Sequence, residues 1–442
     1  MSVETSLGRS LVFQFDRGDS FLLNFVERIS EARKDLFFLS LLNESSAVNN
    51  QGFLGGEAIY DAHMELQRQQ YQMNLSFQQK YGLFENFAYD LCSTYPSLII
   101  LPKEFSMNRK KLESVARFRS RARIPAITWF NRKNQAILSR SSQPLTGLKQ
   151  SICIEDEELL QLLSGGKRMF VIDARGPAAV AGNQLVRGKG AELPSRYRDL
   201  IFLFMGIGNI HTMRASQEKL NAACNGIDGS YTERFYQKVE QSNWLAHIRL
   251  ILDSSCRCAE LLELEQTSVL VHCSDGWDRT AQLVSLAQII LDPYFRTVQG
   301  LAALIEKDWV GFGFKFRDRC FGTDPDERSP VWIQFVDCIY QFQRQFPKHF
   351  EFNERFLLLL AEAPYCGRFA TFGFNTENER TEACKKYKAR AWEFWTELFN
   401  RTEFLNSNFE PYIYGPLWPY TSSKRLILWE SLYLKGDASY AS

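Results

Sequence analysis

The sequence lacks the features of membrane-spanning and secreted chains. It contains no run of about 18 apolar residues, so no transmembrane helix is expected. The opening segment MSVETSLGRS holds an acid and no apolar stretch, so we expect no secretory signal there. Repeats and low-complexity tracts are absent from the 442 residues, a length that fits one large domain or two to three smaller ones.

The chain also lacks an excess of charge of either sign. Its 52 basic and 51 acidic residues leave a formal net charge of +1. This balance excludes a globally basic surface of the kind that coats nucleic acids, so any attraction for an anionic partner must come from local patches. Hydrophobic residues at 45% and charged residues at 23% are typical of a globular protein and not of a disordered one.

Metal-ligand and disulfide patterns are missing as well. The 10 cysteines and 5 histidines are scattered along the chain. The close pair Cys256 and Cys258 has no second pair at metal-ligand spacing. We therefore expect no metal, no other cofactor, and free thiols in a reducing cytosol.

Short apolar runs alternate with helical patterns through the middle of the chain, which predicts an α/β core. Strands are expected at 97–101, 123–130, 136–138, 169–173, 200–204 and 268–272. Helices are expected at 58–78, 155–164, 244–262 and 280–291, with further helices within 297–361 and 376–400. Residues 43–56 are polar and contain glycine, as an early linker would.

The segment SVLVHCSDGWDRTAQ, residues 268–282, is the most informative of the chain. An apolar run leads into a glycine-containing loop that opens with Cys273 and closes with Arg279 at the start of a helical pattern. A loop between a buried strand and a helix N-terminus turns its N–H groups inward, binds anions and favours a thiolate. The thiolate can attack phosphorus while the guanidinium holds two phosphate oxygens, which gives a phosphocysteine that water then hydrolyses.

Two acids in the same loop, Asp275 and Asp278, are the available proton donors for a leaving alkoxide. His272 precedes the cysteine, and we expect it to orient the loop by hydrogen bonding. The competing interpretation is a buried cysteine in an ordinary strand-to-helix turn. The two acids and Trp277 argue against that interpretation, because a simple turn needs only the glycine.

The Cys-x5-Arg spacing is weak evidence by itself, because it recurs elsewhere in the chain. Cys338 with Arg344 and Cys384 with Arg390 show the same spacing. Both segments lack glycine and lie in helical patterns, and a helix cannot enclose a phosphate within its own body. We interpret both cysteines as structural.

The motif HCSDGWDRT resembles the signature of the myotubularin phosphoinositide 3-phosphatases. The similarity spans roughly residues 54–435 and includes RFRSRARIPAITW, IDAR, NIHTMR, WLAHIRLIL, LIEKDW, SPVWIQFV and QFPKHFEFNE. It implies an α/β, cysteine-dependent phosphatase fold, with a central mixed sheet flanked by helices in one large domain. It also implies hydrolysis of the 3-phosphate of phosphatidylinositol 3-phosphate and phosphatidylinositol 3,5-bisphosphate.

The resemblance assigns roles within the loop. Cys273 is the nucleophile and Arg279 the phosphate clamp, and Asp278 is the candidate general acid because the family lacks the separate acid-bearing loop of protein tyrosine phosphatases. The residues that donate loop N–H groups to the phosphate are Ser274, Asp275, Gly276 and Trp277.

Further headgroup contacts follow from matching segments: Asn183, Asn209 and Ile210 would line the pocket, and Lys315 and Arg319 would face the other phosphates. Short amides suit inositol hydroxyls, although each Asn can equally be a turn or cap residue. The loop after Asn183 departs from the family, with Gly188, Lys189 and Gly190 where a glycine-rich triplet is usual. A solvated basic helix face is the alternative for Lys315 and Arg319, which are four residues apart.

The basic segment NRKKLESVARFRSRAR, residues 108–123, has two interpretations. It can face anionic lipid. It can also be a solvated helix followed by internal ion pairs at the entry to a strand, which is the interpretation we favour.

The resemblance also bears on organisation. We expect an N-terminal appendage at 1–50, a possible remnant of a PH-GRAM module, then a phosphatase domain at 51–437 and a tail at 438–442. No heptad run follows the catalytic region, so the family's coiled coil is not expected, and pairing with itself or with another family member stays open.

The expected partners are phosphoinositide headgroups and not nucleic acid, at the cytoplasmic face of endosomal or other intracellular membranes. Two rival functions remain: a headgroup-binding scaffold without turnover, and a protein tyrosine phosphatase.

Overall fold

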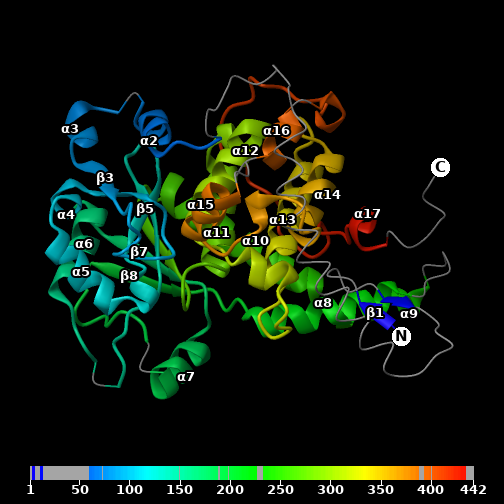
Figure 1. Cartoon of the computed structure of the whole chain (residues 1–442), viewed down its shortest axis with the longest axis horizontal. Helices are drawn as coiled ribbons and strands as arrows, with labels where there is room; N and C mark the ends of the chain where they lie inside the picture. Colours follow the sequence, from blue (N-terminus) through cyan, green and yellow to red (C-terminus); the bar gives the residue numbers. More distant parts are fainter. Residues whose placement is uncertain are drawn as a thin grey trace.

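A computed structural model describes residues 2–4, 10–12, 59–71, 73–148, 150–187, 190–197, 199–225, 232–387, 393–399 and 401–434 (Figure 1). The predicted linker at 43–56 and the tail at 438–442 lie outside the described residues. Of the appendage, only the short antiparallel pair of β1 (Ser2–Glu4) and β2 (Ser10–Val12) is described.

A seven-stranded mixed sheet forms the centre of the molecule, in the order β3-β4-β5-β6-β9-β7-β8. The strands β3, β4, β5 and β6 pair antiparallel, whereas β6, β9, β7 and β8 run parallel. Their bounds are Tyr81–Glu85, Leu98–Pro102, Ala126–Phe130, Ile137–Ser141, Met169–Asp173, Leu200–Phe204 and Ser268–His272 for β3 to β9 in chain order. This arrangement confirms the predicted α/β fold with a mixed sheet flanked by helices.

The central strand β9 is buried along its whole length, as its unbroken apolar run predicts for a parallel strand covered on both faces. Side chains alternate between the two faces of a strand. Val269 and Val271 belong to the core that contains α10 (Trp244–Glu263) and α11 (Arg279–Leu291). Leu270 belongs to the opposite core, with α5 (Arg109–Phe118) and α6 (Ile154–Ser164). His272 therefore lies on the α5 and α6 face.

The remaining helices extend the two layers. In Figure 1 the sheet with α4, α5 and α6 occupies the left, α10 and α11 lie near the centre, and α13, α14 and α17 lie farther right. The other helices are α2 (Ala62–Gln70), α3 (Leu75–Gln78), α4 (Lys103–Ser106), α7 (Pro177–Arg187), α8 (Ile210–Cys224), α9 (Glu233–Gln241), α12 (Val298–Ile305), α13 (Val331–Gln345), α14 (Glu354–Glu362), α15 (Glu377–Tyr387), α16 (Glu393–Phe399) and α17 (Glu430–Tyr433).

Short helical turns connect these elements. Two are π-helical, Glu306–Gly311 and Arg317–Phe321. The 3₁₀ turns are Ser120–Ala122, Pro293–Arg296, Ala363–Tyr365, Ala370–Phe372 and Thr402–Phe404. Tryptophan rings pack the first π turn against α13, with the Trp309 and Trp332 centroids 5.0 Å apart and nearly perpendicular.

Several predicted boundaries shift. The strand expected at 123–130 begins only at Ala126, because the chain before it forms the 3₁₀ turn with positive φ at Arg121 and Ala122. The helix expected at 58–78 is broken between α2 and α3, where Asn74 caps the second helix. The edge strand β3 was not predicted, since its five residues YGLFE include a glycine that weakens the strand pattern.

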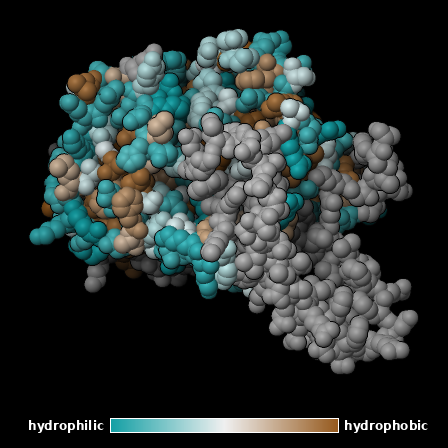
Figure 2. Space-filling view, turned by 45° about the horizontal axis from the view of Figure 1, so that its top comes forward, coloured by the Kyte–Doolittle hydropathy of each residue, from teal (hydrophilic) through white to brown (hydrophobic). Residues whose placement is uncertain are grey.

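No helix among the described residues is long and apolar enough to cross a membrane. Figure 2 shows apolar residues in separate patches among hydrophilic ones on the face turned toward the viewer.

We predict that Leu270→Ala lowers the free energy of unfolding by about 2–5 kcal/mol, because Leu270 is fully buried in the centre of the sheet and the substitution leaves a cavity. The midpoint of urea unfolding measures the change. Leu264→Ala, at a side chain that is 64% exposed, is the matched control and should leave the midpoint nearly unchanged. Equal midpoints for the two variants would contradict the assignment of Leu270 to the core.

Candidate active site

The predicted strand–loop–helix is present at the carboxyl end of β9. Cys273 follows the last residue of the strand, and Arg279 is the first residue of α11. The Cys273 thiol is buried, and its Sγ accepts the N–H of Gly276 at 3.3 Å. The half-buried Arg279 guanidinium donates to the Ile207 carbonyl at 3.0 Å and lies 3.4 Å from the Ser274 hydroxyl. The cysteine and the arginine thus belong to one loop whose ends are both fixed.

Hydrogen bonds from outside the loop turn its carbonyl groups outward. The Gly276 carbonyl accepts from Arg123 Nη2 at 3.0 Å and from Arg140 Nη2 at 2.9 Å. The Ser274 carbonyl accepts the N–H of Gln143 at 3.1 Å. In a trans peptide the N–H points opposite to the C=O. The N–H groups that follow these two carbonyls, at residues 275 and 277, therefore point toward the loop interior, as an anion site requires.

Gly276 is required at its position on two grounds. Its φ is +79°, a conformation that residues with a side chain rarely adopt. A Cβ atom there would lie 2.3 Å from the Ser141 carbonyl oxygen, at the end of β6. The loop therefore rests directly on the neighbouring strand.

The two loop acids have different partners. Ser120 Oγ donates to Asp275 Oδ1 at 2.8 Å. Both oxygens of Asp278 accept from Arg319, with Nε–Oδ1 at 2.9 Å and Nη2–Oδ2 at 3.2 Å. Burial alone would lower the pKa of Arg319, but the Asp278 carboxylate outweighs burial and raises it.

Arg319 and Lys315 lie one helical turn apart, as predicted, with the Arg319 N–H bonded to the Lys315 carbonyl at 2.8 Å. Arg319 is buried and also binds Glu327 at 2.6 Å, so the solvated-face alternative is wrong for this residue. Lys315 is half-buried, with its Nζ 5.0 Å from the centre of the Trp277 ring and 3.4 Å from Asp318.

The other residues predicted to contact the headgroup are Asn183, Asn209 and Ile210. Of the two whose side chains are described, Asn209 and Ile210, neither forms a hydrogen bond to the loop. Asn209 is exposed and caps α8, where its Oδ1 accepts the Thr212 N–H at 3.0 Å. Ile210 is the half-buried first residue of that helix, close to the Ile207 carbonyl that binds Arg279. Asn183 lies within α7, and its side chain and residues 188–189 are outside the described part of the chain. The cap alternative is thus observed for Asn209, while pocket roles for these residues stay predictions.

The basic segment divides between the two interpretations. Arg119 and Arg123 are both buried, which excludes contact with lipid. The internal ion-pair interpretation is confirmed for Arg119, which pairs with Asp156 and Glu192. Arg123 instead donates to Thr94 and to the carbonyls of Gly276 and Phe312. Arg109 and Lys111 lie on the exposed side of α5, where they pair with surface acids.

Sequence reasoning missed several buried polar residues around the loop. Arg175 donates to both carboxylate oxygens of Asp173 and to the Gly190 carbonyl, the latter at 3.0 Å. Arg140 lies in β6 with Asp308, 2.9 Å away, as its ion-pair partner. A charged residue inside a buried strand was the available signal for Arg140, whereas Gln143 and Glu192 carry no local signal.

The two other Cys-x5-Arg segments lie in helices where they are described, which fits their interpretation as structural cysteines. Cys338 is buried within α13, and burial raises its pKa well above the ordinary value. Cys384 lies in α15, and Arg390 is outside the described residues. In the described part of the chain, no group of three His, Cys, Asp or Glu side chains is arranged to hold a metal ion.

Comparison with known proteins identifies the family. A match to the family described as "Myotubularin-like phosphatase domain" covers residues 39–381, so the chain belongs to the myotubularin family of phosphatases. The boundaries predicted from the sequence, 51–437, differ from this match and stay a prediction.

Individual relatives agree with the family assignment. The chain is 39% identical over 361 residues to phosphatidylinositol-3,5-bisphosphate 3-phosphatase MTMR6 of Mus musculus, covering 80% of this chain and 57% of the relative. It is 36% identical over 390 residues to myotubularin of Xenopus tropicalis, covering 86% and 63%. It is 38% identical over 368 residues to phosphatidylinositol-3,5-bisphosphate 3-phosphatase MTMR2 of Bos taurus, covering 79% and 55%. The chain therefore spans less than two thirds of the length of these relatives.

We predict that Gly276→Ala reduces turnover of any phosphate ester by about 10²-fold or more, since the loop cannot keep its inward N–H groups against the Ser141 carbonyl. Phosphate release measures the loss, and circular dichroism checks that the fold is retained. Gly165→Ala is the matched control: its φ is also positive, at +63°, but nothing lies within 4 Å of the added Cβ, so turnover should persist. Similar turnover in both variants would refute the close approach of loop and strand.

Proposed function

We propose that the chain is a phosphoinositide 3-phosphatase that hydrolyses the 3-phosphate of phosphatidylinositol 3-phosphate and phosphatidylinositol 3,5-bisphosphate. The observation that carries the proposal is the buried Cys273 thiol at the base of a loop whose N–H groups turn inward and whose last residue is Arg279. Cys273, Asp278 and Arg279 are all present, which favours turnover over a scaffold that only binds headgroups. The names of the relatives that match, two of them phosphatidylinositol-3,5-bisphosphate 3-phosphatases, support the substrate class.

In this proposal the phosphate is bound by the positive charge of Arg279 and by loop N–H groups that point toward it. The loop N–H groups and the Arg279 guanidinium surround three phosphate oxygens and leave the phosphorus open to the thiolate on one side and to the leaving oxygen on the other. These donors are fixed before the substrate arrives, so they stabilise the charge of the transition state without reorganisation.

Two displacement steps then follow. In the first, the Cys273 thiolate forms a bond to phosphorus, the bond from phosphorus to the inositol 3-oxygen breaks, and that oxygen takes a proton from Asp278. In the second, water attacks phosphorus, gives its proton to Asp278 and displaces the thiolate, releasing inorganic phosphate. Both Asp278 oxygens accept from Arg319, so this pair must open before Asp278 can face the leaving oxygen.

The surroundings of the loop fit a substrate with more than one phosphate. Lys315 offers a partly exposed ammonium beside Trp277, whereas Arg319 is committed to Asp278 and Glu327. Lys315 is therefore the better-placed cation for a second phosphate. A phosphotyrosine side chain has no such second phosphate, which argues against the protein tyrosine phosphatase alternative. A cytoplasmic location with peripheral association to endosomal or other intracellular membranes is part of the proposal, because the substrate is a lipid.

We predict that Cys273→Ser lowers phosphate release from soluble short-chain phosphatidylinositol 3-phosphate by about 10⁴-fold or more, because a serine hydroxyl does not ionise in the loop. Cys384→Ser is the matched control, since it alters the same residue type at the same spacing outside the loop, and should keep full activity. No release by the native chain would support the scaffold, and faster turnover of phosphotyrosine peptides would support the tyrosine phosphatase.

We predict that Asp278→Asn lowers the rate on the lipid by about 10²–10⁴-fold but has much less effect on an aryl phosphate such as p-nitrophenyl phosphate. The inositol alkoxide needs a proton to leave, whereas nitrophenolate does not. Asp275→Asn is the control and should change both rates to a similar extent. If Asp278→Asn lowered the rates on both substrates equally, Asp278 would not be the general acid.

A further inference from the structure

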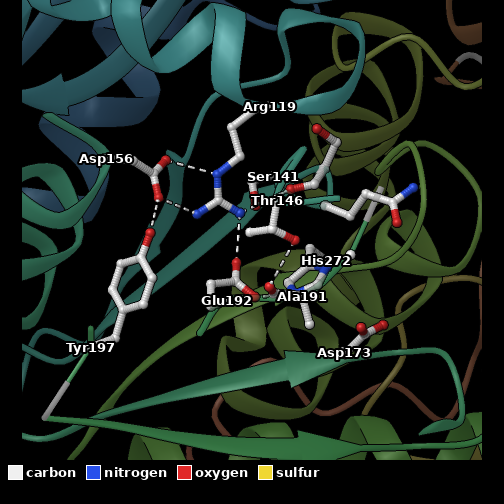
Figure 3. Close-up of polar contacts among 12 residues, drawn as sticks. Arg119, Ser141, Thr146, Asp156, Asp173, Ala191, Glu192, Tyr197 and His272 are labelled. Carbon is white, nitrogen blue, oxygen red and sulfur yellow. Dashed lines mark hydrogen bonds and ion pairs between the residues drawn. The ribbon is translucent and has the colours of Figure 1, made fainter. Parts of the chain in front are cut away.

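A chain of buried ionic side chains runs from the catalytic loop into the α5 and α6 layer (Figure 3). It begins at His272, which is fully buried on the face of the sheet opposite to Cys273. His272 Nδ1 lies 3.1 Å from the Cys273 carbonyl oxygen, and its Nε2 lies 3.2 Å from Glu192 Oε2. The residue before the nucleophile is thus held between the loop backbone and a buried carboxylate.

The chain continues through three more residues. Arg119 Nη1 donates to Glu192 Oε1 at 2.6 Å. The same guanidinium donates to both oxygens of Asp156, at 2.8 and 2.6 Å. Tyr197 closes the chain by donating its hydroxyl to Asp156 Oδ2 at 2.8 Å. These groups come from four separate segments of the sequence, and none of them touches solvent appreciably.

The geometry selects one protonation state of His272. Both ring nitrogens face oxygen acceptors, a carbonyl and a carboxylate. A neutral imidazole carries one N–H and would turn a lone pair toward one of these oxygens. The imidazolium donates from Nδ1 to the Cys273 carbonyl and places its charge 3.2 Å from Glu192 Oε2, as an ion pair. The charged ring is therefore the form that fits both neighbours.

The balance of buried charges also favours the charged form of His272. Glu192 and Asp156 carry two negative charges against the one positive charge of Arg119, so the buried set is neutral only with a charged His272. The other charged groups near His272 are Asp173 and Arg175 on the β7 side, which pair with each other at 2.6 Å, and Cys273 itself.

The directions in which the pKa values of His272 and Glu192 are shifted agree with this balance of charges. Burial lowers the pKa of His272, but Glu192 and Asp173 outweigh burial and raise it above the ordinary value. Burial raises the pKa of Glu192, but His272 and Arg119 outweigh that effect and lower it well below the ordinary range.

We propose that Glu192 is a positioning residue that acts through His272. It keeps the imidazole charged, and this fixed positive charge, one residue from Cys273, stabilises the thiolate that attacks phosphorus. Glu192 touches neither the substrate nor the reacting atoms. The inference deepens the proposed function, but its main test needs no substrate.

The first test is alkylation of Cys273 by iodoacetamide in the native chain and in Glu192→Gln, followed by peptide mass spectrometry between pH 5 and pH 9. Only the thiolate reacts, so the rate reports its fraction. We expect the rate of Glu192→Gln to be about tenfold lower near pH 6 and to approach the native rate at high pH, where the thiolate forms in both chains. Tyr197→Phe is the control. It removes the hydrogen bond to Asp156, which Arg119 separates from Glu192, and it should leave the rate profile unchanged.

The second test uses the native chain alone and does not depend on whether a variant folds. Nitrogen-15 spectra of histidine-labelled protein, with His272 assigned by His272→Gln, should show both ring nitrogens protonated at pH 7. A neutral His272 at pH 7, or an alkylation profile that Glu192→Gln leaves unchanged, would overturn the inference. If alkylation behaves as expected but no phosphate is released from either lipid, the inference stands and the proposed 3-phosphatase function fails.

Discussion

The proposed chemistry of this chain depends on one constraint: the backbone of residues 273–279 must turn its N–H groups toward a common centre. Peptide groups do not adopt that arrangement without help, because their carbonyls must then find partners elsewhere. Buried side chains supply the partners. Arg123 and Arg140 both donate to the Gly276 carbonyl, and the absence of a Cβ at Gly276 lets the loop approach the end of β6.

Strand geometry explains why the loop is supported from two sides. Because β9 alternates its side chains, Cys273 and His272 point to opposite layers. The α10 and α11 layer surrounds the thiol. On the α5 and α6 side the imidazole faces Glu192, which Arg119 links to Asp156 of α6. Buried charges of this kind add little to stability, but removing one member leaves its partner unpaired, so they fix a single arrangement of the groups they hold.

Much of this could be predicted from the sequence because it is local. The strand at 268–272 and the helix that follows are observed where the apolar run and the glycine-containing loop predicted them. The family assignment followed from the same motif and is confirmed. The basic segment shows the limit of such reasoning: composition treated its arginines alike, yet Arg119 is buried in ion pairs while Arg109 lies at the surface.

The sequence by itself determined the proposed reacting groups, since Cys273 and Arg279 occupy one short loop whose conformation depends on adjacent residues. Only the tertiary structure decided which distant side chains pair around that loop. Glu192 reaches Arg119 across 73 residues and Arg319 reaches Asp278 across 41, and neither pair leaves a periodic or compositional trace. The physical reason is that a buried charge is stable only beside its counter-charge, and the packing of the sheet against its helices determines which residues become neighbours.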